Sequence, residues 1–426
     1  MIVDVSIGEA VDKYNILEIK LAKIKDVFKN IEIKKELLSL TNVVEYIQKF
    51  EFFYKLLYYV NEKIWVITDI VKKTKVTDPD FALLSNQIFE YNQKRFRLKN
   101  FFNILCDSSL KEQKGYSKNC CKLIIENEEI LLDKIAEINY ITIEYDIVYI
   151  ETTSTLMDKI KSLFQAVTIV FTEIETQIQI NIKDYYIDPS IKEIFSFKPI
   201  TYLTGGKMGD FIQSLSVINE NFYNTGRKGI VYLSEEGDTF RYGLDATYKD
   251  TQDTIINQRY INAYSIYRNE QIDINLTSWR HSSLLFRENW IKIFSDSYSV
   301  TWGKHKWLTF KADDKDIILV STNPYRFPVS IDFITSIKMY QEQGCEIIFI
   351  SDNEHYYQDF ITRTQLSIPF YKPTSFTEIC MLIHSCKLFI GNLSAPLAIA
   401  FACHKKNIIG FAGTIDDIHN KNMLFF

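Results

Sequence analysis

The chain lacks the residue patterns of a zinc-binding or disulfide-stabilised protein. Its 426 residues include seven cysteines, which are scattered and form no CxxC pair. The six histidines all follow residue 280 without metal-ligand spacing, so we expect no structural zinc and no bound metal. An odd number of unpaired cysteines is typical of buried thiols in a reducing compartment.

Several targeting and catalytic signals are also missing. No HExxH, Walker A or GxSxG sequence occurs. The segment Met1–Val5 has no basic n-region of a signal peptide. The most apolar run, Ser162–Phe171, is interrupted by Gln165 and is too short to span a bilayer. We therefore expect a soluble, cytoplasmic protein without a transmembrane segment.

The chain has no excess of positive charge. Its net charge of −5 argues against non-specific nucleic-acid binding, which needs a basic surface. Hydrophobic residues make up 46% and aromatic residues 14% of the chain, which is enough to bury large cores. A chain of this length is expected to form about two to four domains.

The most informative stretch is a glycine-rich turn between a predicted strand and a predicted helix. A short apolar strand, Ile200–Leu203, runs into Gly205-Gly206-Lys207-Met208-Gly209, and Asp210 then opens an amphipathic helix. Glycines let the backbone approach a ligand closely, and the helix start offers unpaired N–H groups. An acid fixed there can act as a general base. The alternative is an ordinary turn whose acid only favours the helix dipole.

A second strand–turn–helix connection, or joint, lies near the C-terminus. The apolar strand Lys387–Ile390 meets Gly391-Asn392-Leu393-Ser394, and an alanine-rich helix begins near Ala395-Pro396. Proline suits the first turn of a helix, and Ser394 or Asn392 can cap it. Small residues let such a helix pack closely and direct its N-terminus at an anion.

Together the two joints resemble the inverting glycosyltransferases of the heptosyltransferase-like group. That group has two Rossmann-like domains facing a cleft, the GT-B architecture, and a Gly-Asp whose aspartate is the catalytic base; Gly209-Asp210 matches it. The strand Ile317–Thr322 leads to Arg326-Phe327-Pro328, which is similar to the family's basic residue before an aromatic-proline pair. The late family pattern, Asn-Asp-Ser-Gly-Pro-x-His-x-Ala-Ala, is matched at four positions, namely Asn392, Ser394, Pro396 and Ala400.

The chain departs from this late pattern at three positions. Leu393 stands where the family has Asp, Ala395 where it has Gly, and Ala398 where it has His. Two polar groups of the donor site are thereby lost, so the donor differs or the site is weakened. The resemblance covers residues 196–426, about half of the chain.

The resemblance implies a metal-independent sugar transferase that needs no cofactor. The donor would be a nucleotide sugar, and the acceptor a hydroxyl group of a glycan or glycoconjugate. Asp210 would be the base, with the acceptor on a Rossmann-like domain at 196–306 and the donor on one at 307–426. The predicted donor-binding residues are Thr322, Arg326, Asn392, Ser394 and Ala395, and the predicted acceptor and turn residues are Gly206, Lys207, Gly209, Trp279, Arg280 and His281.

The segment 276–307 is rich in aromatic and basic residues. Sugars stack on aromatic rings, and Arg or His can hold hydroxyl or acidic groups, so an acceptor-binding wall is one interpretation. An aromatic core with snorkelling cations is the alternative. The residues concerned are Trp279, Arg280, His281, Arg287, Trp290, Trp302, His305 and Trp307.

Residues 1–118 predict a helical hairpin or bundle, because no glycine lies between Ala10 and Lys114 and the apolar spacing is helical. The expected helices are 11–28, 34–73 and 80–106. This part resembles a small helical family of unknown function, and it could mediate homo-oligomerisation. The similar residues are Ser6–Glu9, Asp12-Lys13, Ile16–Lys20, Asn92, Arg95, Lys99, Asn103 and Lys111–Lys114. We expect their charged members to form solvated helix faces.

Residues 119–195 predict a small α/β linker region. The segments Cys121–Ile125 and Tyr140–Ile150 alternate like strands, whereas Glu128–Glu137 and Leu156–Phe171 have helical spacing. Pro189 then marks the approach to the first Rossmann-like domain.

Two other functions stay open at this point. One is a catalytically inactive GT-B scaffold whose helical N-terminal part mediates protein interaction, which the losses at Leu393 and Ala398 favour. The other is a nucleotide-sugar epimerase, which would need a second acid in the cleft. Asp314-Lys315-Asp316 has the DxD spacing of a metal-binding sequence, but it belongs to a charged linker before a strand.

Overall fold

The computed structural model divides the chain into two compact units, Met1–Lys198 and Pro199–Phe426. No helix in the part of the chain that it describes is long and apolar enough to cross a membrane. It describes residues 4–111, 118–171, 174–285, 288, 290–326, 331–392, 394–405 and 408–411.

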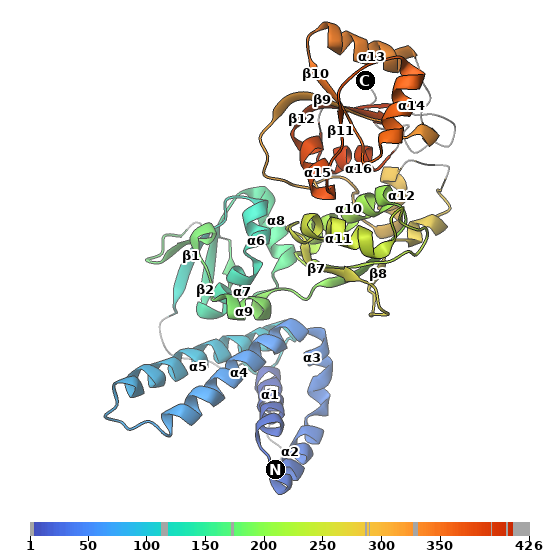
Figure 1. The fold of residues 1–426 in the computed structure, drawn as a ribbon. Helices are drawn as coiled ribbons and strands as arrows, with labels where there is room; N and C mark the ends of the chain where they lie inside the picture. The colour runs from blue at the N-terminus through green and yellow to red at the C-terminus, as the bar shows by residue number, and fades with distance from the viewer. Residues whose placement is uncertain are drawn as a thin grey trace. The chain divides into compact units, whose positions relative to one another are not determined.

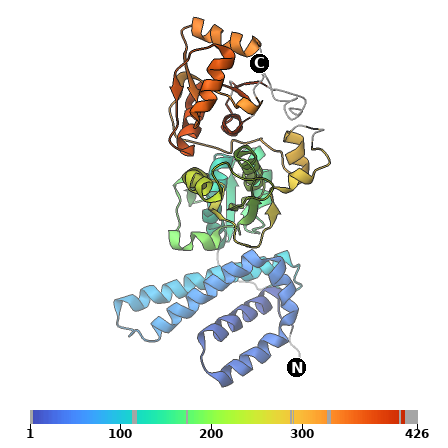
Figure 2. The same cartoon turned by 45° about the vertical axis from the view of Figure 1, so that its right-hand side comes forward.

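The first unit begins with a helical part, drawn in blue in Figure 1. Its longest helices, α4 and α5, form an antiparallel hairpin in both Figure 1 and Figure 2, and α1 packs against both. Apolar side chains such as Leu57, Val60 and Phe102 are buried there. The elements are α1 (Ile7–Lys23), α2 (Val27–Ser39), η1 (Thr41–Val43), α3 (Val44–Lys49), α4 (Glu51–Val71) and α5 (Pro79–Leu105).

The predicted hairpin is correct, but two of the predicted helices are broken. The helix expected over 11–28 ends at Lys23, because Ile24 is extended and Asp26 starts α2 by accepting from the N–H of Lys29. The helix expected over 34–73 is interrupted by η1 and at Phe50. The helix expected over 80–106 is confirmed as α5, which Asp78 caps.

Charged residues near the N-terminus of α1 pair with residues of α5. Arg95 donates from Nε and Nη2 to Asp12, which is 1% exposed, and Nζ of Lys99 lies 2.6 Å from Oε2 of Glu9. Asn103 accepts from the N–H of Gly8, where a Cβ would lie 2.2 Å from the carbonyl oxygen of Lys99. The prediction of solvated faces was therefore wrong for Asp12 and Lys99, whereas the side chain of Glu9 is exposed. Glu112, Gln113 and Lys114 lie outside the described residues.

The rest of the first unit is a parallel sheet with the strand order β3-β2-β1-β4. Helices connect β1 to β2 and β2 to β3, which is the usual crossover between parallel strands. Its elements are β1 (Cys120–Ile124), α6 (Glu128–Asp133), α7 (Ile135–Glu144), β2 (Ile147–Glu151), α8 (Ser154–Leu163), β3 (Ile169–Val170), β4 (Gln179–Asn181), η2 (Ile182–Asp184) and α9 (Pro189–Phe195).

Two predictions for this region need correction. The strand expected over 140–150 is helical up to Glu144, because α7 is buried along most of its length and its β-branched residues pack as core. The helix expected over 156–171 ends at Leu163, and Ile169–Val170 forms β3.

The second unit contains two further parallel sheets. The first has the order β7-β6-β5-β8, the same arrangement along the chain as the sheet of the first unit. The strand expected over 272–276 is shorter, and β7 was not predicted. The elements are β5 (Ile200–Thr204), α10 (Met208–Thr225), β6 (Gly229–Leu233), α11 (Leu244–Ile256), β7 (Ile261–Ile266), β8 (Ile274–Asn275), η3 (Ser278–His281) and α12 (Trp290–Tyr298).

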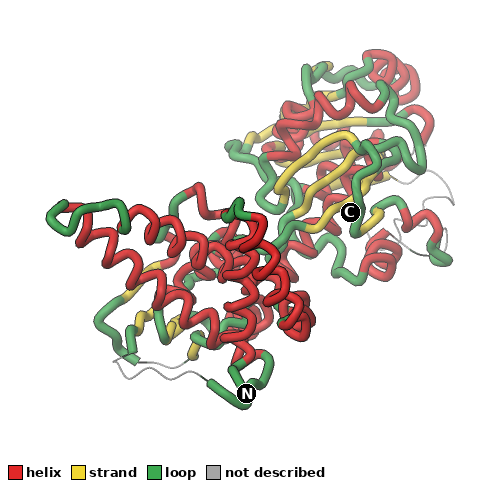
Figure 3. The backbone as a smooth tube through the Cα atoms, turned by 90° about the horizontal axis from the view of Figure 1, so that it is seen from below, coloured by secondary structure: helices red, strands yellow, loops and turns green. Residues whose placement is uncertain are grey.

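The C-terminal sheet has the order β11-β10-β9-β12-β13. Figure 3 shows that the strands of the chain, drawn in yellow, lie among helices. The predicted α/β class with parallel sheets is thus confirmed. The elements are β9 (Lys315–Ser321), η4 (Pro324–Arg326), α13 (Ile331–Glu342), β10 (Glu346–Ile350), α14 (Glu354–Thr364), β11 (Phe370–Tyr371), α15 (Phe376–Ser385), β12 (Cys386–Asn392), α16 (Ala395–Ala402) and β13 (Ile408–Phe411).

The two sheets of the second unit are joined through their helices. α10 packs against α16, and α11 packs against α15. Asp250 on α11 accepts from the first N–H of α15, that of Phe376, at 2.9 Å. The connecting segment contacts both halves, because the indole N–H of Trp307 donates to Ile212 on α10 while its backbone N–H donates to Ala402 on α16.

Candidate functional site

The strongest candidate site lies at the carboxyl end of β5. In this sheet the chain passes from β5 to β6 on one side, whereas β8 pairs with β5 on the other. Such a change of direction is where ligands bind in open parallel α/β sheets. Asp210 follows β5 and Arg280 follows β8, so both lie at this point.

The glycine-rich turn places Asp210 in the first turn of α10. Gly206 has a φ of +95°, and Lys207 is extended as the residue before the helix. A Cβ at Gly205 would lie 2.7 Å from the carbonyl oxygen of Glu236, so this glycine lets the turns after β5 and β6 meet. A Cβ at Gly209 would meet nothing within 4 Å, which leaves open space beside the start of the helix.

Asp210 is held by Arg280, which follows β8, the strand that pairs with β5 on the side opposite β6. Nη2 of Arg280 donates to Oδ2 of Asp210 at 2.7 Å, and the two side chains are 19% and 25% exposed, respectively. Burial raises the pKa of Asp210, and the charge of Arg280 opposes that rise. A carboxylate with a raised pKa and a fixed orientation has the properties of a general base.

Two further acids follow β6 and were missed in the sequence. Glu236 accepts from Asn275 and Thr277 at 2.8 and 2.9 Å and so ties the turns after β6 and β8 together. Asp238 pairs with Lys207 at 3.1 Å. Burial acts to raise the pKa of Asp238, but hydrogen bonds from the Thr239 backbone and Lys207 keep it below its usual value. Their position directly after the predicted strand 229–233 was the available signal.

The aromatic segment is mostly core. Trp279, Trp290, Trp302 and Trp307 are each at most 7% exposed, and Trp302 donates to the carbonyl of Gln213 on α10. This burial favours the aromatic-core alternative over an acceptor-binding wall, because buried indoles present no face to a sugar.

The polar residues of the same segment differ in exposure. His281 is exposed, whereas Nδ1 of His305 lies 2.8 Å from Oε2 of the buried Glu220. The His305 ring stacks on Tyr223 at 3.7 Å. Arg287 lies outside the described residues. Of the predicted acceptor residues, the structure therefore brings Gly206, Lys207, Gly209 and Arg280 together around Asp210.

A second switch point lies between β9 and β12. Asn392, at the end of β12, is fully buried and accepts from the N–H of Asn323 at 2.7 Å while donating to its carbonyl at 2.8 Å. Thr322 is buried beside it. The amide of Asn392 therefore fixes the turn after β9, which is a structural role for a residue predicted to bind the donor.

The helix that follows β12 begins without a side-chain cap. Ser394 donates its hydroxyl to the carbonyl of Asn392 instead of capping, so the predicted cap is wrong. The uncapped N–H groups at Ala395 leave the start of α16 able to meet an anion. Arg326 ends η4, but its side chain, like Leu393, Phe327 and Pro328, lies outside what the structure describes.

The carboxyl edges of the two sheets touch through their loops. The hydroxyl of Tyr242, in the loop after β6, donates to Asp352, which follows β10, at 2.9 Å. Arg241 lies 3.8 Å from the same carboxylate and stacks over the ring of Tyr356 on α14.

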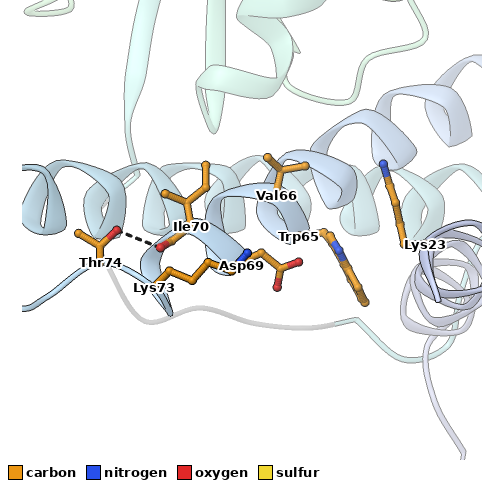
Figure 4. Close-up of a pocket in the computed structure, with 7 residues that line it drawn as sticks. All are labelled: Lys23, Trp65, Val66, Asp69, Ile70, Lys73 and Thr74. Carbon is orange, nitrogen blue, oxygen red and sulfur yellow. Dashed lines mark hydrogen bonds between the residues drawn. The ribbon is translucent and has the colours of Figure 1, made fainter. Parts of the chain in front are cut away.

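No metal cluster marks another site in the part of the chain that the structure describes. No group of three metal-ligating side chains occurs within the described ranges, and Asp316 of the DxD sequence pairs with Lys387 at 2.7 Å. A shallow pocket of about 450 Å³ lies against α4 in the helical part (Figure 4). Its lining is Lys23, Trp65, Val66, Asp69, Ile70, Lys73 and Thr74.

Comparisons with known proteins give distant structural neighbours. No family model and no curated protein matches the chain. A glycosyl transferase family 9 protein from Veillonella parvula is 12% identical, with a TM-score of 0.33, over 50% of this chain and 80% of that one. The dodecameric iron-containing heptosyltransferase TibC is 13% identical, with a TM-score of 0.32, over 51% and 60%.

Other neighbours are more distant still. The E. coli heptosyltransferase WaaC is 7% identical, with a TM-score of 0.21, over 68% of this chain and 88% of that one. A UDP-GlcNAc 2-epimerase from Methanocaldococcus jannaschii is 9% identical, with a TM-score of 0.20, over 72% and 94%. Identities and TM-scores this low do not establish a shared activity.

Proposed function

We propose that the second unit transfers a sugar from a nucleotide-sugar donor to a hydroxyl group of a glycan or glycoconjugate. The observation that carries this proposal is the environment of Asp210. A partly buried carboxylate with a raised pKa stands at a helix start, at the switch point of a parallel sheet. That position is where a ligand of such a sheet binds, and that chemistry is what a general base needs.

In the proposed reaction, Asp210 takes the proton of the acceptor hydroxyl. The hydroxyl oxygen forms a bond to the anomeric carbon from the face opposite the leaving group, and the bond from that carbon to the diphosphate oxygen breaks with its electron pair. The configuration at the anomeric carbon is thereby inverted. The nucleoside diphosphate leaves with the negative charge.

We place the donor at the second switch point, between β9 and β12. The uncapped start of α16 and the cation of Arg326 would stabilise the leaving diphosphate by fixed charge, so the proposed step uses no metal ion. Thr322 and Ser394 lie at the same point. Acceptor and donor would then meet in a cleft between the two sheets, as in a GT-B enzyme. The contact between Tyr242 and Asp352 supports this, because it joins loops at the carboxyl edges of both sheets.

Two alternatives have support of their own. An inactive scaffold would explain the departures from the family pattern at Leu393 and Ala398, and Ala398 is buried. The helical part of the first unit would then be the interacting part, with a second copy of the chain as one partner. A nucleotide-sugar epimerase needs a second acid, and Asp238 supplies a carboxylate that interacts electrostatically with Asp210.

Ligand binding tests the enzyme against the scaffold. We expect one nucleotide sugar of a broad panel to raise the melting temperature of the full chain, because a ligand at 100 times its dissociation constant stabilises by about 2.7 kcal/mol. Incubation with that compound should release nucleoside diphosphate by transfer or slow hydrolysis. Binding of no nucleotide sugar and no release of nucleoside diphosphate would contradict the proposal, and release of an epimerised donor would favour the epimerase.

A further inference from the structure

The glycines around Asp210 make room for an arginine of the same chain. Gly206 and Gly237 have φ values of +95° and +91°, and both lie against the guanidinium of Arg280. A Cβ at Gly206 would lie 2.1 Å from Nη2, and one at Gly237 would lie 2.9 Å from Cζ. Neither position can take a larger residue unless the guanidinium moves, quite apart from the backbone conformation.

A buried indole adds a third wall. The Arg280 guanidinium lies over the Trp279 ring at 4.3 Å, and Trp279 is 6% exposed and packed against Trp290. Stacking on an aromatic face is a common way to hold a guanidinium. The burial of Trp279, which argues against a sugar contact, suits this role.

The hydrogen bonds of Arg280 point to positioning as its task. Its Nη2 donates to Oδ2 of Asp210 at 2.7 Å, whereas its buried Nη1 has no hydrogen-bond partner in the described part of the chain. A buried donor without a partner costs about 1–3 kcal/mol. The position of Arg280 thus leaves one buried donor without a partner and requires two glycines with positive φ, and its hydrogen bond to Asp210 is retained.

We propose that Gly206, Gly237 and Trp279 form a cradle for Arg280, and that Arg280 is the positioning residue that orients the Asp210 carboxylate as a base. The glycine-rich turn then serves a guanidinium instead of a ligand phosphate. The catalytic part of this inference rests on the proposed function, whereas the effect on Asp210 itself does not.

The charges around Asp210 set the expected direction of the effect. Arg280 comes from the turn after β8, Asp238 from the turn after β6, and Lys207, paired with Asp238, from the turn before α10. Burial and Asp238 raise the pKa of Asp210, and the Arg280 charge lowers it. Removing Arg280 therefore leaves the factors that favour the protonated acid, so Asp210 should titrate at higher pH.

A titration of Asp210 tests the cradle directly. The full chain, labelled with ¹³C at aspartate carboxyl groups, would be followed by NMR from pH 3 to 8, with the signal assigned by its loss in Asp210→Asn. We expect Arg280→Gln and Gly237→Ala to move the Asp210 titration to higher pH, and Arg280→Lys to move it less, because it retains the charge. An unchanged titration in Arg280→Gln or Arg280→Lys would overturn the inference.

Gly243→Ala is the matched control. Gly243 has a similar φ of +80°, but a Cβ there would meet nothing within 4 Å. Its substitution therefore places alanine at a similar positive φ without displacing Arg280, and the Asp210 titration should stay in place. If Gly237→Ala and Gly243→Ala shift it equally, backbone strain is the cause and the cradle is refuted.

The rate of sugar transfer separates this inference from the proposed function. In Arg280→Gln the ratio of the rate at pH 5 to that at pH 8 should fall, by up to about tenfold for each unit by which the pKa of Asp210 rises, since an arginine lowers a neighbouring carboxyl pKa by about 1–3 units. A moved titration in a protein without transferase activity would support the cradle and refute the transferase. Sugar transfer in a protein whose Asp210 titration does not move in Arg280→Gln would support the transferase and refute the cradle.

Discussion

Asn392→Ala should destabilise the C-terminal sheet, because the Asn392 amide makes two buried hydrogen bonds. It accepts from the N–H of Asn323 and donates to its carbonyl, at 2.7 and 2.8 Å, and Asn392 is fully buried. Truncation leaves both backbone groups without this partner. Each loss costs about 1–2 kcal/mol, so the free energy of unfolding should fall by about 2–4 kcal/mol.

Urea unfolding followed by tryptophan fluorescence measures this loss, because four of the five tryptophans lie in the second unit. Asn392→Asp distinguishes hydrogen bonding from packing. It keeps the shape and the acceptor for the Asn323 N–H but faces the Asn323 carbonyl with an oxygen, so it should be no more stable than the alanine variant. Asn257→Ala removes one exposed bond to Asp253 and serves as the control. A loss of unfolding free energy below about 1 kcal/mol in Asn392→Ala would refute the role of Asn392 in fixing the turn after β9.

The remaining predictions concern two ion pairs and one hydrogen-bonded carboxylate. Arg95→Leu leaves the buried Asp12 without its bidentate partner and should destabilise the helical part by about 3–5 kcal/mol in a circular-dichroism melt. Lys35→Met breaks only the exposed pair with Glu32 and should change stability by less than about 1 kcal/mol; equal losses would contradict burial as the cause. Hydrogen bonds from the Thr374 backbone and from Tyr371 lower the pKa of Glu378 from 4.5 to about 2, so its stabilisation is full above pH 4.5 and is lost as the pH falls towards 2. Glu378→Gln should remove that pH dependence. If the free energy of unfolding of this variant still falls between pH 4.5 and pH 2 as in the wild type, the hydrogen bonds of Glu378 do not contribute to it.

Local signals were enough to predict the strand–turn–helix joints. At 200–210 and 387–396 a short apolar strand, a turn rich in glycine or asparagine and a helix start follow one another in sequence, and the structure has both strands and both helices. The second strand is longer than expected, because β12 continues through Gly391 and Asn392 of the predicted turn, and Leu393 lies outside the described residues. The helix 80–106 was equally clear from its apolar spacing, and in the structure Asp78 caps its start while Cys106 follows its last residue.

Long-range packing explains what the sequence did not predict. The residues Tyr140–Glu144 have strand-like composition, but they form the end of α7, where Ile141, Thr142 and Ile143 are buried. The partnership of Asp210 with Arg280 joins residues 70 positions apart, and only the pairing of β5 with β8 brings them together. The roles of Asn392 and of the tryptophans likewise depend on neighbours that are distant in sequence.

The central claim is that Asp210 is the base of a sugar transfer, and the rate of transfer in Asp210→Asn tests it most directly. This variant keeps the size of the side chain but removes the base, so the rate should fall by about 10²–10⁴-fold while donor binding and melting temperature change little. Asp245→Asn, an exposed acid in the first turn of the next helix, α11, should retain the wild-type rate. Transfer at the wild-type rate in Asp210→Asn would show that Asp210 is only a helix-terminal acid and would contradict the account.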